Sequence, residues 1–284
     1  MSELLPGFVI RRILVALDAS PDSSAALEAA VDLAARMGAE LVGLFVEDTA
    51  LLRLAEIPLC REVPYFSAAG LPLTRGRMEF KLRSQAEQVR KALATAAQRA
   101  RVAWSFRSVQ GKVTSEICAA AADVDLVALG IEGWSLSRSQ AGSTALEIAA
   151  SALPVLLWPG RRPAQEAHLV VYYDGSPAAR RGLLAAMALA RAGMDGVTVL
   201  AEPGNEADSF LEQELERKGV EAHAIYLASA GPQDLLGALK AEKGGILMLG
   251  SRKFLNKLPP LGTLLRATEI PLLLLGNGTG SEIR

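Results

Sequence analysis

The stretch Ile13-Leu14-Val15-Ala16-Leu17-Asp18-Ala19-Ser20-Pro21 decides the fold. Its five apolar residues are typical of a buried strand, and the Ser-Pro that follows is typical of a helix start. The Ala/Leu-rich segment Ala25–Met37 predicts that helix. The same pattern returns as Leu169-Val170-Val171-Tyr172-Tyr173-Asp174-Gly175-Ser176-Pro177, with Ala178–Ala192 as its helix. This repetition predicts two diverged copies of one small α/β unit.

Three further landmarks recur in the same order in both copies: a strand that ends in glycine, a polar loop that leads to a second glycine, and an apolar strand led by proline. They are Asp125–Gly130, Gly142-Ser143 and Pro154–Trp158 in the first copy, and Gly245–Gly250, Gly262-Thr263 and Pro271–Leu275 in the second. In each copy, 12 positions separate the first glycine from the second. Chance is a poor explanation of this spacing.

Between these landmarks, strands alternate with helices. We expect strands at Leu41–Val46, Ser105–Val109, Val197–Glu202 and Val220–Leu227, and helices at Met78–Arg99, Ser115–Ala122, Asp208–Lys218 and Pro232–Lys243. The alternation predicts βαβ units, and therefore two tandem, doubly wound, five-stranded parallel sheets of the α/β class.

We place the first domain at residues 1–160 and the second, shorter and more degenerate, at 168–284. The excess length of the first copy falls at Asp48–Gly76. This insertion is predicted to be a partly ordered flap.

Composition narrows the classes of function. The chain has 284 residues, 50% of them hydrophobic, and a formal net charge of −1. Because the net charge is so small, the protein has no strong overall electrostatic field that would attract nucleic acid or an anionic membrane. We find no apolar stretch long enough to span a membrane, and no secretory signal. Cys60 and Cys118 are expected to stay reduced, so a cytoplasmic location is predicted.

Ligands of open parallel sheets bind beyond the carboxyl ends of the strands, where the topology switches direction. Asp18 and Gly130 each end a strand that is expected to lie there. The loop Gly130-Ile131-Glu132-Gly133, followed eight residues later by Gly142-Ser143-Thr144, has the glycines and hydroxyls of a phosphate cradle. Ordinary turns and helix caps use the same residues, so a purely structural role stays open.

This order of motifs resembles the universal stress protein family in its tandem two-domain form. The resemblance implies an adenine nucleotide α-hydrolase-like fold in each half, with the halves paired through Pro154–Trp158 and Pro271–Leu275 as an intrachain pseudo-dimer. It also implies ATP, with Mg, as the cofactor. Asp18 would lie near the adenosine and Gly130 near the ribose, with the phosphates surrounded by Gly133, Gly142, Ser143 and Thr144. The weaker counterparts in the second copy are Asp174, Gly250, Lys253, Gly262 and Thr263.

Some residues depart from the family pattern. The loop Trp134–Ala141 has eight residues where the family usually has nine, and Glu132 places a carboxylate where phosphates would approach. In the second copy Lys253 replaces the second glycine. The first copy is therefore the better candidate for a nucleotide site.

The rest of the chain offers little chemistry. His168 and His223 lie in different sequence contexts, so we expect no metal site. No catalytic set can be assembled, and we expect at most slow ATP hydrolysis. The sequence therefore predicts a regulatory or protective protein that binds ATP or a related adenine nucleotide in its first domain. A nucleotide-free scaffold that uses residues 48–76, a slow ATPase, a binder of small apolar ligands and a homodimer stay open.

Overall fold

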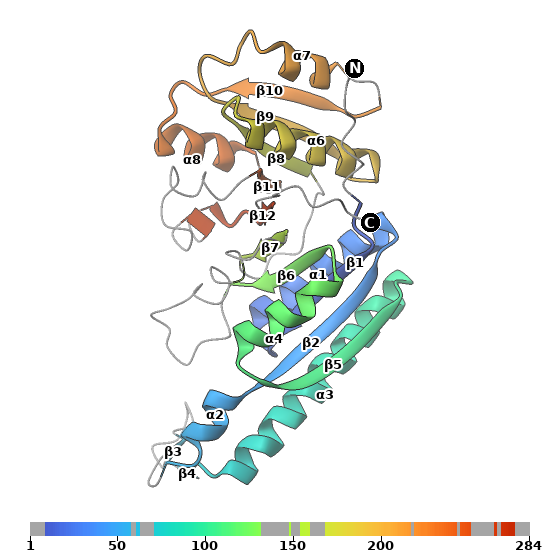
Figure 1. Cartoon of the computed structure of the whole chain (residues 1–284), viewed down its shortest axis with the longest axis vertical. Coiled ribbons are helices and arrows are strands. Elements are labelled where there is room, and N and C mark those ends of the chain that lie inside the picture. Colours follow the sequence, from blue (N-terminus) through green and yellow to red (C-terminus); the bar gives the residue numbers. More distant parts are fainter. Residues whose placement is uncertain are drawn as a thin grey trace.

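A single ten-stranded sheet forms the centre of the structure (Figure 1). The computed structural model describes residues 9–57, 61–62, 71–131, 148, 154–159, 168–216, 219–242, 245–250, 264–265 and 268–275. The first half contains β1 (Arg12–Leu17), α1 (Pro21–Met37), β2 (Glu40–Asp48), α2 (Thr49–Leu54), β3 (Arg61–Glu62), β4 (Leu71–Pro72), α3 (Arg75–Ala100), β5 (Trp104–Gly111), α4 (Val113–Ala120), β6 (Leu126–Gly130) and β7 (Val155–Trp158). The second half contains β8 (His168–Tyr173), α6 (Pro177–Arg191), β9 (Gly196–Ala201), α7 (Ser209–Leu215), β10 (Ala222–Tyr226), α8 (Pro232–Ala241), β11 (Ile246–Leu249) and β12 (Leu272–Leu274).

The strand order of the sheet is β10-β9-β8-β11-β12-β7-β6-β1-β2-β5. Each half contributes five strands, and all neighbours within a half are parallel. In each half the chain first builds outward in one direction and then returns to the other side of its first strand. The predicted pair of doubly wound five-stranded sheets is therefore confirmed. The linker, residues 160–167, lies outside the described residues, and the domain limits stay a prediction.

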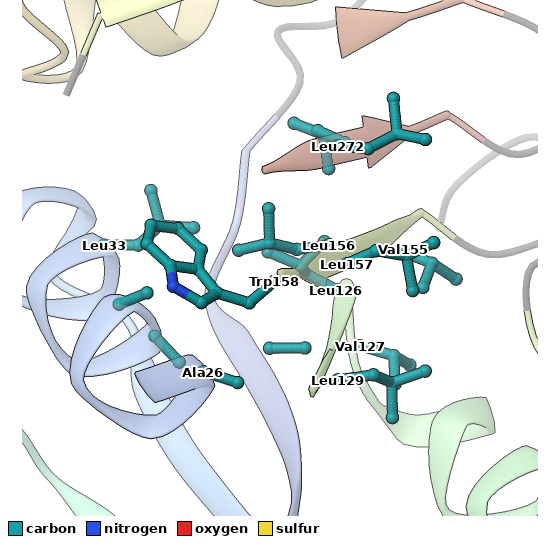
Figure 2. Close-up of a cluster of buried hydrophobic side chains, with 14 of the residues drawn as sticks. Ala26, Leu33, Leu126, Val127, Leu129, Val155, Leu156, Leu157, Trp158 and Leu272 are labelled. Atoms are coloured by element: carbon teal, nitrogen blue, oxygen red, sulfur yellow. The ribbon is translucent and has the colours of Figure 1, made fainter. Parts of the chain in front are cut away.

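The two halves meet through their last strands, where β7 pairs antiparallel with β12. The register sets Leu157 opposite Leu272 and Leu156 opposite Leu273. These four leucines are at most 3% exposed, so the seam between the halves is part of the hydrophobic core. Figure 2 shows Leu156, Leu157 and Leu272 in one cluster with Trp158, whose indole ring lies beside α1.

The Ser-Pro pair begins a helix in both copies. The Ser20 hydroxyl accepts a hydrogen bond from the backbone N–H of Ser23, and Pro21 occupies the first turn of α1. In the same way, the Ser176 hydroxyl accepts from Ala179 at the start of α6. A serine cap satisfies a backbone donor that would otherwise lack a partner, and proline has no donor to lose there.

The described residues of the insertion include both helix and strand. It contains α2, the antiparallel β3–β4 hairpin and the start of α3. Figure 1 shows these elements projecting together beyond the ends of β2 and β5. Within the described ranges, no helix is long and apolar enough to cross a membrane.

Candidate functional site

Asp18 and Gly130 lie at neighbouring strand ends. β1 pairs with β6 in a register that sets Val15 opposite Ala128, so Asp18 and Ile131 follow the ends of adjacent strands. From here the chain builds toward β2 and β5 on one side and toward β7 on the other. The two residues therefore mark the topological switch point of the first half, where open α/β sheets bind ligands.

Among the described residues, only one carboxylate oxygen of Asp18 has a hydrogen-bond partner. Oδ1 accepts a hydrogen bond from the Ser20 N–H at 2.9 Å, and the Asp18 N–H donates to the Ser23 hydroxyl at 3.1 Å. Oδ2 is buried and has no hydrogen-bond partner within the described part of the chain. Burial raises the pKa of Asp18, the nearby charge of Asp22 adds to this, and the hydrogen bonds oppose it. A ligand N–H or O–H donor would satisfy Oδ2.

The turn after the first strand has the same backbone in both halves. Asp174 Oδ1 accepts from the Ser176 N–H at 3.1 Å, just as Asp18 accepts from Ser20. Gly175 has a φ of 74°, and its counterpart Ala19 has a φ of 62°. An alanine in this left-handed conformation is strained, whereas glycine is not.

Gly130, which ends β6, and Gly250, which directly follows β11, allow helices to approach the sheet closely. A Cβ on Gly130 would lie 2.7 Å from the carbonyl carbon of Asp22 and 2.8 Å from the backbone nitrogen of Ser23, both in α1. A Cβ on Gly250 would lie 2.0 Å from the carbonyl oxygen of Ala178 in α6. Helix packing is therefore sufficient to explain both glycines, whether or not a ligand also approaches them.

The predicted phosphate cradle lies outside the described residues. This holds for Gly133, Gly142, Ser143 and Thr144, for Glu132 and Trp134, and for Lys253, Gly262 and Thr263. Their roles stay predictions. Of the predicted site residues, the structure therefore brings Asp18 and Gly130 together in one half, and Asp174 and Gly250 at the corresponding positions of the other.

Two tyrosines at the end of β8 hold polar partners that the sequence analysis missed. The Tyr173 hydroxyl donates to Asp208 Oδ2 at 2.7 Å, and the Tyr172 hydroxyl donates to Glu202. Burial, followed by the hydrogen bond to Asp208, raises the pKa of Tyr173 to about 12. Burial and Glu202 raise the pKa of Tyr172 as well. The available signal was the pair of tyrosine hydroxyls that directly follows the aliphatic residues Leu169–Val171.

Both histidines meet at one buried hydroxyl, although they lie in different sequence contexts. Thr198 Oγ1 lies 2.7 Å from His168 Nε2 and 3.3 Å from His223 Nε2, and it donates to Glu242 Oε2 at 3.3 Å. Strand register explains the convergence, because His168, Thr198 and His223 belong to the adjacent strands β8, β9 and β10. Among the described residues, no group of three His, Cys, Asp or Glu is arranged to hold a metal ion.

Two solved structures that are similar over nearly the whole chain give the same fold. A universal stress protein from Archaeoglobus fulgidus DSM 4304 is similar over 96% of this chain and 98% of its own, with a TM-score of 0.71 and 18% identity. A functionally unknown protein from Pseudomonas aeruginosa PAO1 covers 94% of this chain and 93% of its own, with a TM-score of 0.50 and 13% identity. A universal stress protein solved in complex with cAMP aligns with 52% of this chain and 97% of its own, with a TM-score of 0.38 and 18% identity.

A comparison with curated protein sequences found no match. The profile of the Universal stress protein family matches residues 10–159, which is more than half of the chain and includes both Asp18 and Gly130. Together with the doubly wound sheet, this match shows that the chain belongs to the universal stress protein family.

Proposed function

We propose that the first half binds an adenine nucleotide at the carboxyl ends of β1 and β6, and that the chain is a regulatory or protective protein which responds to that nucleotide. The proposal rests on Oδ2 of Asp18, which is buried and has no hydrogen-bond partner among the residues that the structure describes. A buried carboxylate oxygen without a donor is costly, and the amino group of adenine supplies such a donor. Asp18 is then the residue that recognises the base.

The phosphates are assigned to the glycine loop. Gly133, Gly142, Ser143 and Thr144 would supply backbone amides and hydroxyls to them, as the family resemblance implies. ATP, with Mg²⁺, is the proposed ligand, and Gly130 lies between the base and the phosphates. We assign no catalytic residue, because the proposed contacts bind phosphate without activating water.

Calorimetric titration of nucleotide-stripped protein with ATP tests this function. We expect saturable binding by the wild-type chain and none by Gly142→Val, whose side chain would obstruct the loop. Asp18→Asn keeps an acceptor for the Ser20 N–H but turns an amide donor toward the base. Its affinity should fall by about 10- to 100-fold, the equivalent of one hydrogen bond to a charged group. No binding by the wild-type chain at millimolar ATP would refute the function.

One observation favours a second candidate, a scaffold that needs no nucleotide. Phe80 on α3 is 76% exposed, and Ile57 after α2 is 55% exposed. α2 and the start of α3, in or next to which these residues lie in the chain, project beyond the ends of β2 and β5 (Figure 1). Large apolar side chains gathered at an exposed site are typical of protein interaction surfaces. Loss of partner capture by Phe80→Ser, measured in the absence of nucleotide, would assign this second role.

A further inference from the structure

We propose that residues 202–208, here called the strap, cover the carboxyl end of β8 and the turn at Asp174, where a nucleotide would bind by analogy with the first half, so that each chain carries a single nucleotide in its first half. The number of nucleotides bound per chain rests on the proposed function. Closure of the strap does not depend on it and can be measured without any nucleotide. The strap follows β9 and leads into α7, so it lies beside the carboxyl end of β8.

Adjacent tyrosines on β8 hold the two ends of the strap. Tyr172 and Tyr173 point to opposite faces of the sheet, as successive strand residues do. The Tyr172 hydroxyl donates to Glu202 at the start of the strap, and the Tyr173 hydroxyl donates to Asp208 Oδ2 at its end, at 2.7 Å. Both tyrosines are at most 2% exposed, so their hydroxyls are fixed by packing.

Asp208 also connects the strap to the two neighbouring helices. Its Oδ1 accepts a hydrogen bond from the Phe210 N–H at 3.0 Å, and this contact caps the start of α7. Arg180 of α6 lies 3.3 Å from Asp208 Oδ2, and its guanidinium group lies over the Phe210 ring, 5.1 Å from the centroid. The end of the strap is therefore held by β8, α6 and α7 together.

Asn205 lies in the middle of the strap, next to the turn that follows β8. Its Nδ2 donates to the Glu202 carbonyl oxygen at 2.9 Å, and its own backbone carbonyl oxygen accepts from the Asp208 N–H at 3.2 Å. Asn205 Oδ1 is 2.4 Å from the point where Gly175 would carry a Cβ. Gly175 follows Asp174 directly, so this side chain occupies the approach to that carboxylate.

The first half has different residues at the matching positions. Aligning Asp18 with Asp174 places Ala16 and Leu17 where the two tyrosines stand, and neither has a hydroxyl. Ala19 replaces Gly175, so its methyl group takes the space that an asparagine fills in the second half. β2 also leads at once into α2, which Asp48 caps by accepting from the Ala50 N–H at 2.8 Å. The strap is thus specific to the second half.

Counting ATP per chain by calorimetry tests the single site. We expect one equivalent in the wild-type chain, one of unchanged affinity in Asp174→Asn, and binding about 10- to 100-fold weaker in Asp18→Asn. Two equivalents in the wild-type chain, or a loss confined to Asp174→Asn, would overturn the inference. A wild-type chain that binds no ATP would overturn the proposed function and the count of one, and closure of the strap is then decided by the next measurement.

Hydrogen exchange followed by mass spectrometry reads the strap in nucleotide-free protein. The double variant Tyr173→Phe/Asn205→Ala removes its end and its middle contact, and Tyr226→Phe on β10 is a matched tyrosine control. We expect exchange of residues 202–210 to be at least tenfold faster in the double variant than in the wild-type chain, and unchanged in the control. Equal exchange in all three proteins would overturn closure by the strap.

Discussion

Replacing Gly250 with alanine would place a methyl group 2.0 Å from the Ala178 carbonyl oxygen. Ordinary contact begins near 3.4 Å, so α6 and the end of β11 would have to separate by about 1.4 Å. Overpacking of this kind destabilises the folded state by about 1 to 3 kcal/mol. The lower conformational entropy of alanine in the unfolded chain offsets about 0.4 to 1 kcal/mol of this loss. We expect Gly250→Ala to lower the free energy of unfolding by about 2 kcal/mol.

Urea denaturation followed by circular dichroism measures this loss, and thermal unfolding should show a midpoint lower by about 4 to 8 °C. Gly130→Ala has a longer nearest contact of 2.7 Å, so its loss should be smaller, about 1 kcal/mol. Gly237, an exposed glycine in α8 with no atom within 4 Å of the position that an alanine methyl group would take, is the control. Gly237→Ala should stabilise by about 0.5 to 1 kcal/mol. If Gly250→Ala matches this control, the close helix–strand packing described above is refuted.

Three further outcomes can be checked by denaturation. Ala19→Gly should stabilise by about 0.5 to 1 kcal/mol, because it relieves the left-handed backbone strain; a loss of stability would contradict this. Thr198→Val should cost about 1 to 3 kcal/mol by leaving Glu242 and both imidazoles without their hydroxyl, whereas Thr198→Ser retains it; equal stability of the two variants would argue against the shared hydroxyl. Because the pKa of Asp18 is raised in the folded state, the folded chain binds this proton more tightly than the unfolded chain, and the wild type loses stability as the pH rises above the ordinary aspartate pKa of 3.8. Asp18→Asn should therefore gain stability relative to wild type as the pH rises above this value, and a difference that stays constant with pH would refute the shift.

Much of the fold could be predicted because it depends on local patterns. Strands buried on both faces appear as short apolar runs, and the repeat gives their order in both halves. Boundaries were less certain where polar residues belong to an element. The strand expected at Leu41–Val46 extends over Glu40–Asp48, and the helix expected from Met78 begins at Arg75. Charged residues at exposed ends do not disturb a strand or helix, so they leave no hydrophobic signal.

The candidate site could be predicted only where its contacts are local. The turn that joins Asp18 to Ser20 is two residues long and follows from the motif. Tyr173 and Asp208 are 35 positions apart, and His168 and Thr198 are 30 apart. These contacts depend on which strands are neighbours and in what register. That information lies in the assembled sheet and not in any single segment.

The antiparallel seam between β7 and β12 restricts how the sheet can grow beyond one chain. Each of these strands covers the outer edge of the other, so β5 and β10 are the outermost strands. Pairing of β5 with β5 of a second copy would close a two-fold assembly, whereas pairing of β5 with β10 would repeat without end as a fibre. Arg107 is exposed in the middle of β5, and a charge at an edge opposes both. β7 and β12 consist entirely of apolar residues, so an exposed edge on either strand would be prone to aggregation. Because the chain pairs these two strands with each other, neither edge is exposed.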